Sequence, residues 1–94
     1  MTKTVVITRH PALVDLLRER GLTDGTEPVI DHATPDQVRG RHVIGVLPLS
    51  LAVEAESVTE IPLSLTPEDR GKELDLERLR QIAGSPRTYA VREQ

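Results

Sequence analysis

The sequence predicts a small α/β domain with a mostly parallel sheet flanked by short helices, and three features support this. Short β-branched runs alternate along the chain with short helical patterns, which is typical of parallel strands joined by crossover helices. The two strongest strands, at residues 4–8 and 41–46, are rich in Val and Ile, as expected of strands buried on both faces. A proline-containing break and then a helix follow each of them. The 94 residues contain no internal repeat, so we expect one domain spanning residues 1–94.

The first strand and first helix form the most distinctive stretch. After the strand at residues 4–8, a break at residues 9–11 precedes a helical stripe of leucines at positions 13, 16 and 17. Pro11 suits the first helical position, where its missing N–H costs nothing. Gly21 is predicted to end the helix after a basic last turn.

The middle of the chain predicts two further strands and two short helices. Residues 28–32 are a short strand, which Pro28 places at a strand start or a sheet edge. Residues 34–37, Thr-Pro-Asp-Gln, have the composition of a helix start with an N-cap threonine. The strand at residues 41–46 follows, and after a second break we expect a short helix over residues 51–56.

The last third continues the alternation. Residues 58–65 are a strand candidate interrupted by Pro62, and residues 66–69 favour a turn or helix start. Helical spacing of apolar residues, acidic early and basic late, predicts a helix over residues 74–82 that ends by Gly84. Residues 88–91 are the last strand candidate.

Composition excludes several classes of protein. A formal net charge of −3 argues against a general duplex-DNA binder or a protein that lies on a membrane surface. No apolar run approaches the roughly 20 residues needed to span a bilayer. The chain has no cysteine, which excludes disulfides and fits a reducing compartment, so we expect a cytoplasmic protein. Tyr89 is the only aromatic residue, so the core must be aliphatic. A small aliphatic core is often supplemented by oligomerisation, which makes a homodimer plausible.

Strand order then predicts where a site would lie. If the strands follow the flavodoxin-like order 2-1-3-4, the first and third are neighbours at a topological switch point, and ligands bind outside the carboxyl ends of strands there. The residues that this order brings to one rim are Thr8, Arg9, His10, Leu47, Pro48, Leu49 and Ser50.

Arg9 and His10 are the main functional candidates on this rim. They follow a buried strand and precede a helix N-terminus, where free N–H groups and the helix dipole favour an anion such as phosphate. A purely structural role for Arg9 and His10 remains open, because polar residues at such turns are often helix caps or solvated side chains. For Ser50, the sequence favours a cap of the helix that begins near Leu51 over a role as a nucleophile. His32 ends the second strand and either faces the same rim or is an ordinary loop residue.

Other chemistry finds little support in the sequence. There is no glycine-rich phosphate loop or dinucleotide fingerprint. The three histidines lack zinc-like spacing, so we expect no metal site and no cofactor. Arg70 and Lys72 flank Gly71 in a polar loop that is either a solvated connector or a phosphate clamp.

Taken together, these motifs resemble a family of small CRISPR-associated accessory proteins found with type III systems. The resemblance covers nearly the whole chain in order. It is carried by residues 8–13, by residues 43–48 leading into Leu51-Ala52, by residues 63–65 and 70–74, and by residues 89–91.

The resemblance implies a compact Rossmann-like, CARF-like dimer that degrades or binds cyclic oligoadenylate second messengers, with cyclic tetra-adenylate as the expected ring. A ring nuclease of this kind needs no metal, because a ribose 2′-hydroxyl attacks the adjacent phosphate and leaves a 2′,3′-cyclic phosphate. Arg9 would then contact phosphate, and His10 would act as a general acid or base. Ser50 or the nearby backbone amides would hold another oxygen, and Arg70 or Lys72 would close over the ligand. Two alternatives stay open: a binding protein that sequesters or senses the messenger without cutting it, and a structural accessory subunit.

Overall fold

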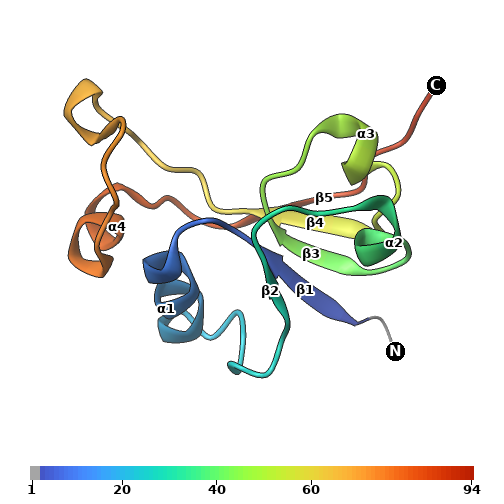
Figure 1. Ribbon diagram of the computed structural model, residues 1–94, viewed down its shortest axis with the longest axis horizontal. Helices are drawn as coiled ribbons and strands as arrows, with labels where there is room; N and C mark the ends of the chain where they lie inside the picture. Colours follow the sequence, from blue (N-terminus) through green and yellow to red (C-terminus); the bar gives the residue numbers. More distant parts are fainter. Residues whose placement is uncertain (1–2) are drawn as a thin grey trace.

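The computed structural model describes residues 3–94, which form a five-stranded sheet with short helices (Figure 1). In chain order the elements are β1 (Thr4–Ile7), α1 (Pro11–Glu19), β2 (Val29–Ile30), α2 (Pro35–Val38), β3 (His42–Gly45), α3 (Leu49–Ala52), β4 (Ser57–Glu60), the 3-10 helix η1 (Pro67–Asp69), α4 (Leu76–Ile82) and β5 (Arg87–Tyr89). None of the helices in residues 3–94 is long and apolar enough to cross a membrane.

The strands lie in the order β2-β1-β3-β4-β5. β1 pairs in parallel with both β2 and β3, and β3 pairs in parallel with β4. The mostly parallel α/β sheet predicted from the sequence is therefore confirmed, and β1 and β3 are neighbours. The last strand, β5, runs antiparallel to β4. In Figure 1 the chain leaves β4, forms α4 beyond the carboxyl end of the sheet and returns from that same end, which requires the antiparallel direction.

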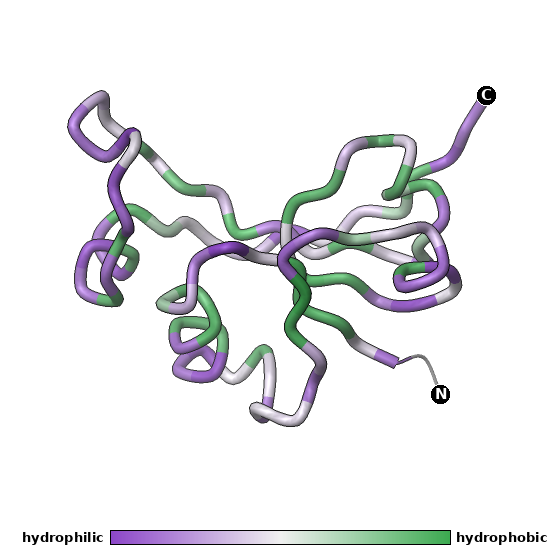
Figure 2. Tube along the Cα trace, in the orientation of Figure 1, coloured by the Kyte–Doolittle hydropathy of each residue, from purple (hydrophilic) through white to green (hydrophobic). Residues whose placement is uncertain are grey.

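Helices cover both faces of the sheet, so the central strands are apolar on both sides. Val6 and Ile44 face α1 and α4, where they pack with buried leucines and Ile82. On the other face, buried valines and Ile7 pack against α2 and α3. Figure 2 shows the resulting concentration of hydrophobic residues along β1 and β3. Because the valines and isoleucines of β1 and β3 are buried, the β-branched runs in the sequence predicted these two strands correctly.

Several predicted bounds were wrong, and proline explains two of them. The helix expected over residues 51–56 is α3, which begins at Leu49 because the Pro48 carbonyl accepts from the amides of Leu51 and Ala52. The strand expected over residues 58–65 stops at Glu60, two residues before Pro62, and Leu63 keeps only an isolated bridge to Ala83. The strands expected over residues 28–32 and 88–91 are shorter or shifted, since β2 has two residues and β5 begins at Arg87.

Charged contacts join the end of α1 to the end of α4. Glu19 forms an ion pair with Arg80, which lowers the pKa of the Glu19 carboxyl through hydrogen bonding to the guanidinium. Arg20 donates to the carbonyl oxygens of Ala83 and Gly84, at 3.3 and 2.7 Å, just past the end of α4. These contacts tie the carboxyl end of α1 to the carboxyl end of α4.

Candidate functional site

A cavity of about 480 Å³ opens at the carboxyl ends of β1, β2 and β3. Its rim consists of Thr8, Arg9 and His10 after β1, of Asp31, His32 and Ala33 after β2, and of Val46, Leu47 and Pro48 after β3. Its apolar lining includes Leu13, Ile44, Leu51, Ile61 and Leu63. The cavity therefore combines a few charged and polar side chains with many aliphatic ones, which is typical of small-molecule sites.

Gly45 shapes the point where β3 ends beside β1. It pairs with Ile7 in the parallel register and has a φ of +146°, a conformation that side chains strongly disfavour. A glycine that looked isolated in the sequence is therefore required by the backbone at the cavity.

His10 lies at the start of α1, where it is the N-cap residue in an extended conformation. Its backbone N–H donates to Oγ1 of Thr8 at 3.1 Å, and its carbonyl accepts from the amide of Leu13. No side chain caps the N-terminus of α1. The half-buried His10 thus sits on a turn whose backbone is held by hydrogen bonds, next to the positive end of the helix dipole.

Arg9 contacts a residue from a different loop. Its Nη2 lies 3.3 Å from Nδ1 of His32. The two loops are brought together because the amide of Thr8 donates to the carbonyl of Ile30 at 3.0 Å, which extends the β1–β2 pairing to the cavity. Both side chains are exposed at the mouth. Arg9 carries a permanent positive charge at the rim, and Asp31 contributes the nearby carboxylate.

The structure brings five of the eight predicted site residues to one cavity: Thr8, Arg9, His10, Leu47 and Pro48. It does not bring Ser50 there. Ser50 is exposed as the second residue of α3, so the interpretation of Ser50 as the cap of that helix is wrong. Pro48 occupies the N-cap position instead.

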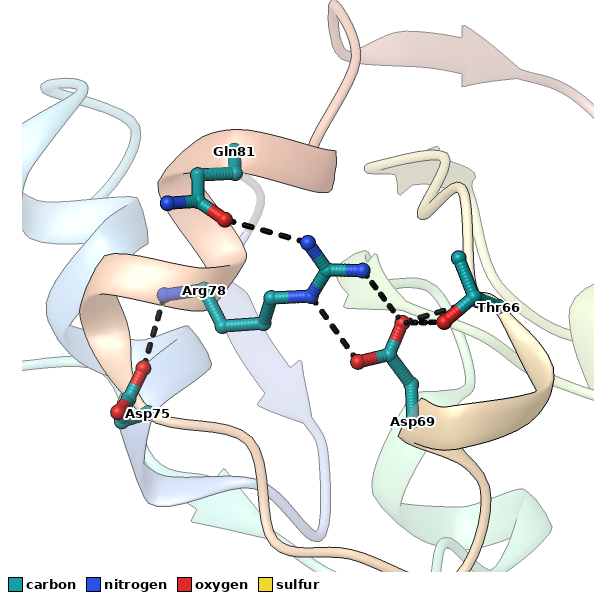
Figure 3. Close-up of polar contacts among 5 residues, drawn as sticks. All are labelled: Thr66, Asp69, Asp75, Arg78 and Gln81. Carbon is teal, nitrogen blue, oxygen red and sulfur yellow. Dashed lines mark hydrogen bonds and ion pairs between the residues drawn. The ribbon is translucent and has the colours of Figure 1, made fainter.

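Arg70 and Lys72 also lie outside the cavity lining, in the exposed loop between η1 and α4. Asp69, at the end of η1 just before that loop, is joined to α4 through Arg78 (Figure 3). Asp69 accepts from Nε and Nη2 of Arg78 at 3.0 and 2.8 Å, and from the amide and hydroxyl of Thr66. Hydrogen bonding to Arg78 is the largest cause that holds the pKa of Asp69 far below its usual range.

Sequence reasoning missed Asp31 as a rim residue and left His32 undecided. The signal was available in principle, because both residues directly follow β2 and the carboxyl ends of parallel strands share one edge of the sheet. β2 has only two residues, so its carboxyl end could not be located from the sequence. Across residues 3–94, no group of three or more His, Asp or Glu side chains is arranged to hold a metal ion.

Comparison with known families adds an independent finding. The family described as "Putative CRISPR-associated protein (Cas_VVA1548)" matches residues 5–92. The chain belongs to this CRISPR-associated family. The match includes every strand and helix from β1 to β5 except the first residue of β1, so the whole cavity of this CRISPR-associated chain lies within it. No curated protein and no solved structure matches the chain significantly.

Proposed function

We propose that this CRISPR-associated chain is a cytoplasmic, homodimeric, Rossmann-like ring nuclease that degrades cyclic oligoadenylates of type III systems, with cyclic tetra-adenylate as the preferred ring. The observation that carries the proposal is the convergence of Arg9 and His10 at the mouth of a cavity of about 480 Å³, at the carboxyl ends of neighbouring parallel strands. Membership of a CRISPR-associated family supports the biological setting.

The chemistry of the cavity suits a nucleotide. Arg9 at the rim offers charge-assisted, bidentate hydrogen bonds to a phosphate. The aliphatic lining, which includes Ile44 and Ile61, offers contact to a base. A nucleotide ligand therefore places its anionic part at the exposed mouth and its flat heterocycle on the apolar side.

A two-fold dimer suits a ring with several equivalent phosphates. An isologous interface presents the same rim twice, once from each copy. Val46 and Leu49, which are 69% and 75% exposed, lie in and just after the β3–α3 connection that borders the cavity. A second copy packed there would remove this apolar surface from water and enclose the ligand between the two mouths.

Cleavage in this proposal uses a nucleophile that the ligand itself carries. The 2′-hydroxyl oxygen of one ribose bonds to the adjacent phosphorus as the bond from phosphorus to the 5′-oxygen breaks. The 2′-hydroxyl proton goes to a base, and the departing 5′-oxygen receives a proton from an acid. His10 serves in one of these two roles, and Arg9 stabilises charge on the non-bridging oxygens. The products are linear oligoadenylates that end in a 2′,3′-cyclic phosphate.

The proposed chemistry does not use Ser50, Arg70 or Lys72. Within one protomer none of them lines the cavity. Arg70 and Lys72 keep a role only if the partner copy or a movement of their loop carries them to the ligand.

The second candidate function is binding without cleavage. It is favoured by the exposure of Arg9 and His32 at the mouth, since a site that is open to water gives weaker electrostatic stabilisation of a transition state than a closed one. Such a protein would sequester or sense the messenger.

Incubation with cyclic tetra-adenylate in excess EDTA, followed by chromatography of the nucleotides, separates these functions. A ring nuclease converts the ring to linear products. A binding protein retains the ligand tightly and returns it intact after denaturation. A protein with neither effect on the ligand contradicts both candidates and favours a structural accessory subunit.

A further inference from the structure

The hydrogen bond between Arg9 and His32 can have only one direction, from Arg9 to His32. A guanidinium has five N–H donors and no acceptor, so Arg9 must be the donor. His32 Nδ1, 3.3 Å from Arg9 Nη2, must then be the acceptor, which requires that Nδ1 carry no proton. A neutral imidazole with an unprotonated Nδ1 carries its proton on Nε2. The geometry thus selects one tautomer of His32.

We infer that His32 is a positioning residue: its neutral Nε2–H tautomer holds the Arg9 guanidinium at the mouth of the cavity, and protonation of His32 releases it. This inference rests on the proposed function for the identity of the ligand. Arginine has a long side chain with much rotamer freedom. A partner that fixes the guanidinium before the ligand arrives lowers the entropic cost of phosphate binding.

Protonation of His32 would turn its attractive contact with Arg9 into a repulsive one. Imidazolium has an N–H at both ring nitrogens. The Nδ1–H of His32 would then face the N–H of Arg9 Nη2, with no acceptor between them, and two positive charges would lie side by side. Histidine is the side chain that ordinarily changes charge between pH 5 and 8. The other titratable groups of the cavity lining are Arg9 and His10 from the β1–α1 connection and Asp31 from the segment after β2. The β3–α3 connection contributes only Val46, Leu47 and Pro48 to the lining, so it adds no charge.

Two replacements of His32 separate its role as a hydrogen-bond acceptor for Arg9 from the effect of its side-chain size. His32→Asn keeps an amide oxygen near the position of Nδ1, accepts a hydrogen bond and does not titrate. His32→Leu keeps a side chain of similar width and accepts nothing. Because His32 is exposed, both variants are expected to fold, which circular dichroism checks.

The first measurement needs no nucleotide. Long-range ¹H–¹⁵N correlation spectra of the parent protein at pH 8 are expected to show an unprotonated His32 Nδ1 and a protonated Nε2. The Arg9 Nε–H group should become more mobile in His32→Leu but not in His32→Asn. An Nδ1–H tautomer, or an Arg9 side chain equally mobile in all three proteins, overturns the inference.

The second measurement uses cyclic tetra-adenylate in binding and single-turnover assays. We expect His32→Leu to weaken binding about tenfold, which is the size of one hydrogen bond, and His32→Asn to stay within about threefold of the parent. We also expect binding by His32→Asn to depend less on pH than binding by the parent, because the asparagine amide keeps the acceptor and takes up no proton. In an Arg9→Ala background, His32→Leu should have no further effect, because His32 acts through Arg9. An equal additional loss in that background overturns the inference, as does an unchanged affinity in the single variant. If the parent protein neither binds nor cleaves the ring, the proposed function fails, and the spectra alone decide whether His32 holds Arg9.

Discussion

Gly45 of β3 lies against Ile7 of β1 so closely that a Cβ atom on Gly45 would stand 2.1 Å from the Ile7 carbonyl oxygen. The two residues end neighbouring strands and both line the cavity. Their close approach is therefore a condition for bringing the β1–α1 and β3–α3 connections to one rim.

Gly45→Ala is expected to lower the free energy of unfolding by about 2–4 kcal/mol, because it adds backbone strain to a steric clash in a packed region. Denaturant unfolding measures this loss. Gly71→Ala is the matched control, since Gly71 also has a positive φ of 74° but no atom within 4 Å of its Cβ position. That control should cost only about 1 kcal/mol. Equal costs for the two variants would show that the approach of β3 to β1 does not constrain position 45.

Arg9→Ala is expected to weaken both binding and cleavage of cyclic tetra-adenylate. A guanidinium paired with phosphate contributes in the ground state and the transition state alike, and its loss should cost about 1.5–3 kcal/mol. Calorimetry and single-turnover rates measure the two effects. Arg92→Ala removes the same charge from an exposed position outside the cavity lining and should leave both unchanged. Equal losses in the two variants would mean that net charge, and not the rim contact, determines affinity.

His10→Ala is expected to lower the single-turnover rate and spare affinity. General acid–base catalysis is typically worth about 10²–10⁴-fold in rate. The same binding and rate assays separate the two quantities. Cleavage at the parental rate by a folded His10→Ala protein would remove the histidine from proton transfer and leave positioning and charge as the whole catalytic contribution.

Asp69 and Arg78 predict a pH dependence of stability. The pKa of Asp69 is lowered in the folded protein, chiefly by hydrogen bonding to Arg78, whereas in the unfolded chain it returns to about 3.9. The contribution to stability is therefore fully present above about pH 4 to 5 and is lost as the pH falls below that range. Unfolding measured from pH 7 to pH 2 should show a smaller acid-induced loss in Asp69→Asn than in the parent. Asp36→Asn is the control, because Asp36 pairs with Arg39 while 88% of its side chain is exposed, and it should leave the profile unchanged.

The parts of the fold that sequence predicted well are those where burial leaves a local pattern. β1, β3 and α1 were recognisable because Val, Ile and Leu residues there face the core at strand or helix spacing. Gly21 was a correct helix stop, since it follows α1 with a φ of 74°. The neighbouring positions of β1 and β3 then brought Arg9, His10, Leu47 and Pro48 together as expected.

The parts that sequence did not predict depend on contacts between distant segments. The contact of Arg9 with His32 joins residues 23 positions apart, and no local pattern marks it. Ser50 lies inside α3 because that helix begins at Leu49, two residues before the expected start at residue 51. The Pro48 carbonyl is the first acceptor of the helix. Arg70 and Lys72 lie outside the cavity lining, in a loop flanked by Asp69 and Arg78. Asp69 and Arg78 form an ion pair that no local sequence pattern predicts.

The proposed function requires that the chain open a cyclic oligoadenylate ring by attack of the ligand's own 2′-hydroxyl. The most direct test is mass spectrometry of the products after incubation of cyclic tetra-adenylate with excess protein in EDTA, beside a ring in which every 2′-hydroxyl is replaced by hydrogen. We expect linear adenylates ending in a 2′,3′-cyclic phosphate from the first ring and no reaction of the second. An intact first ring at high protein concentration, or cleavage of the 2′-deoxy ring, would contradict it.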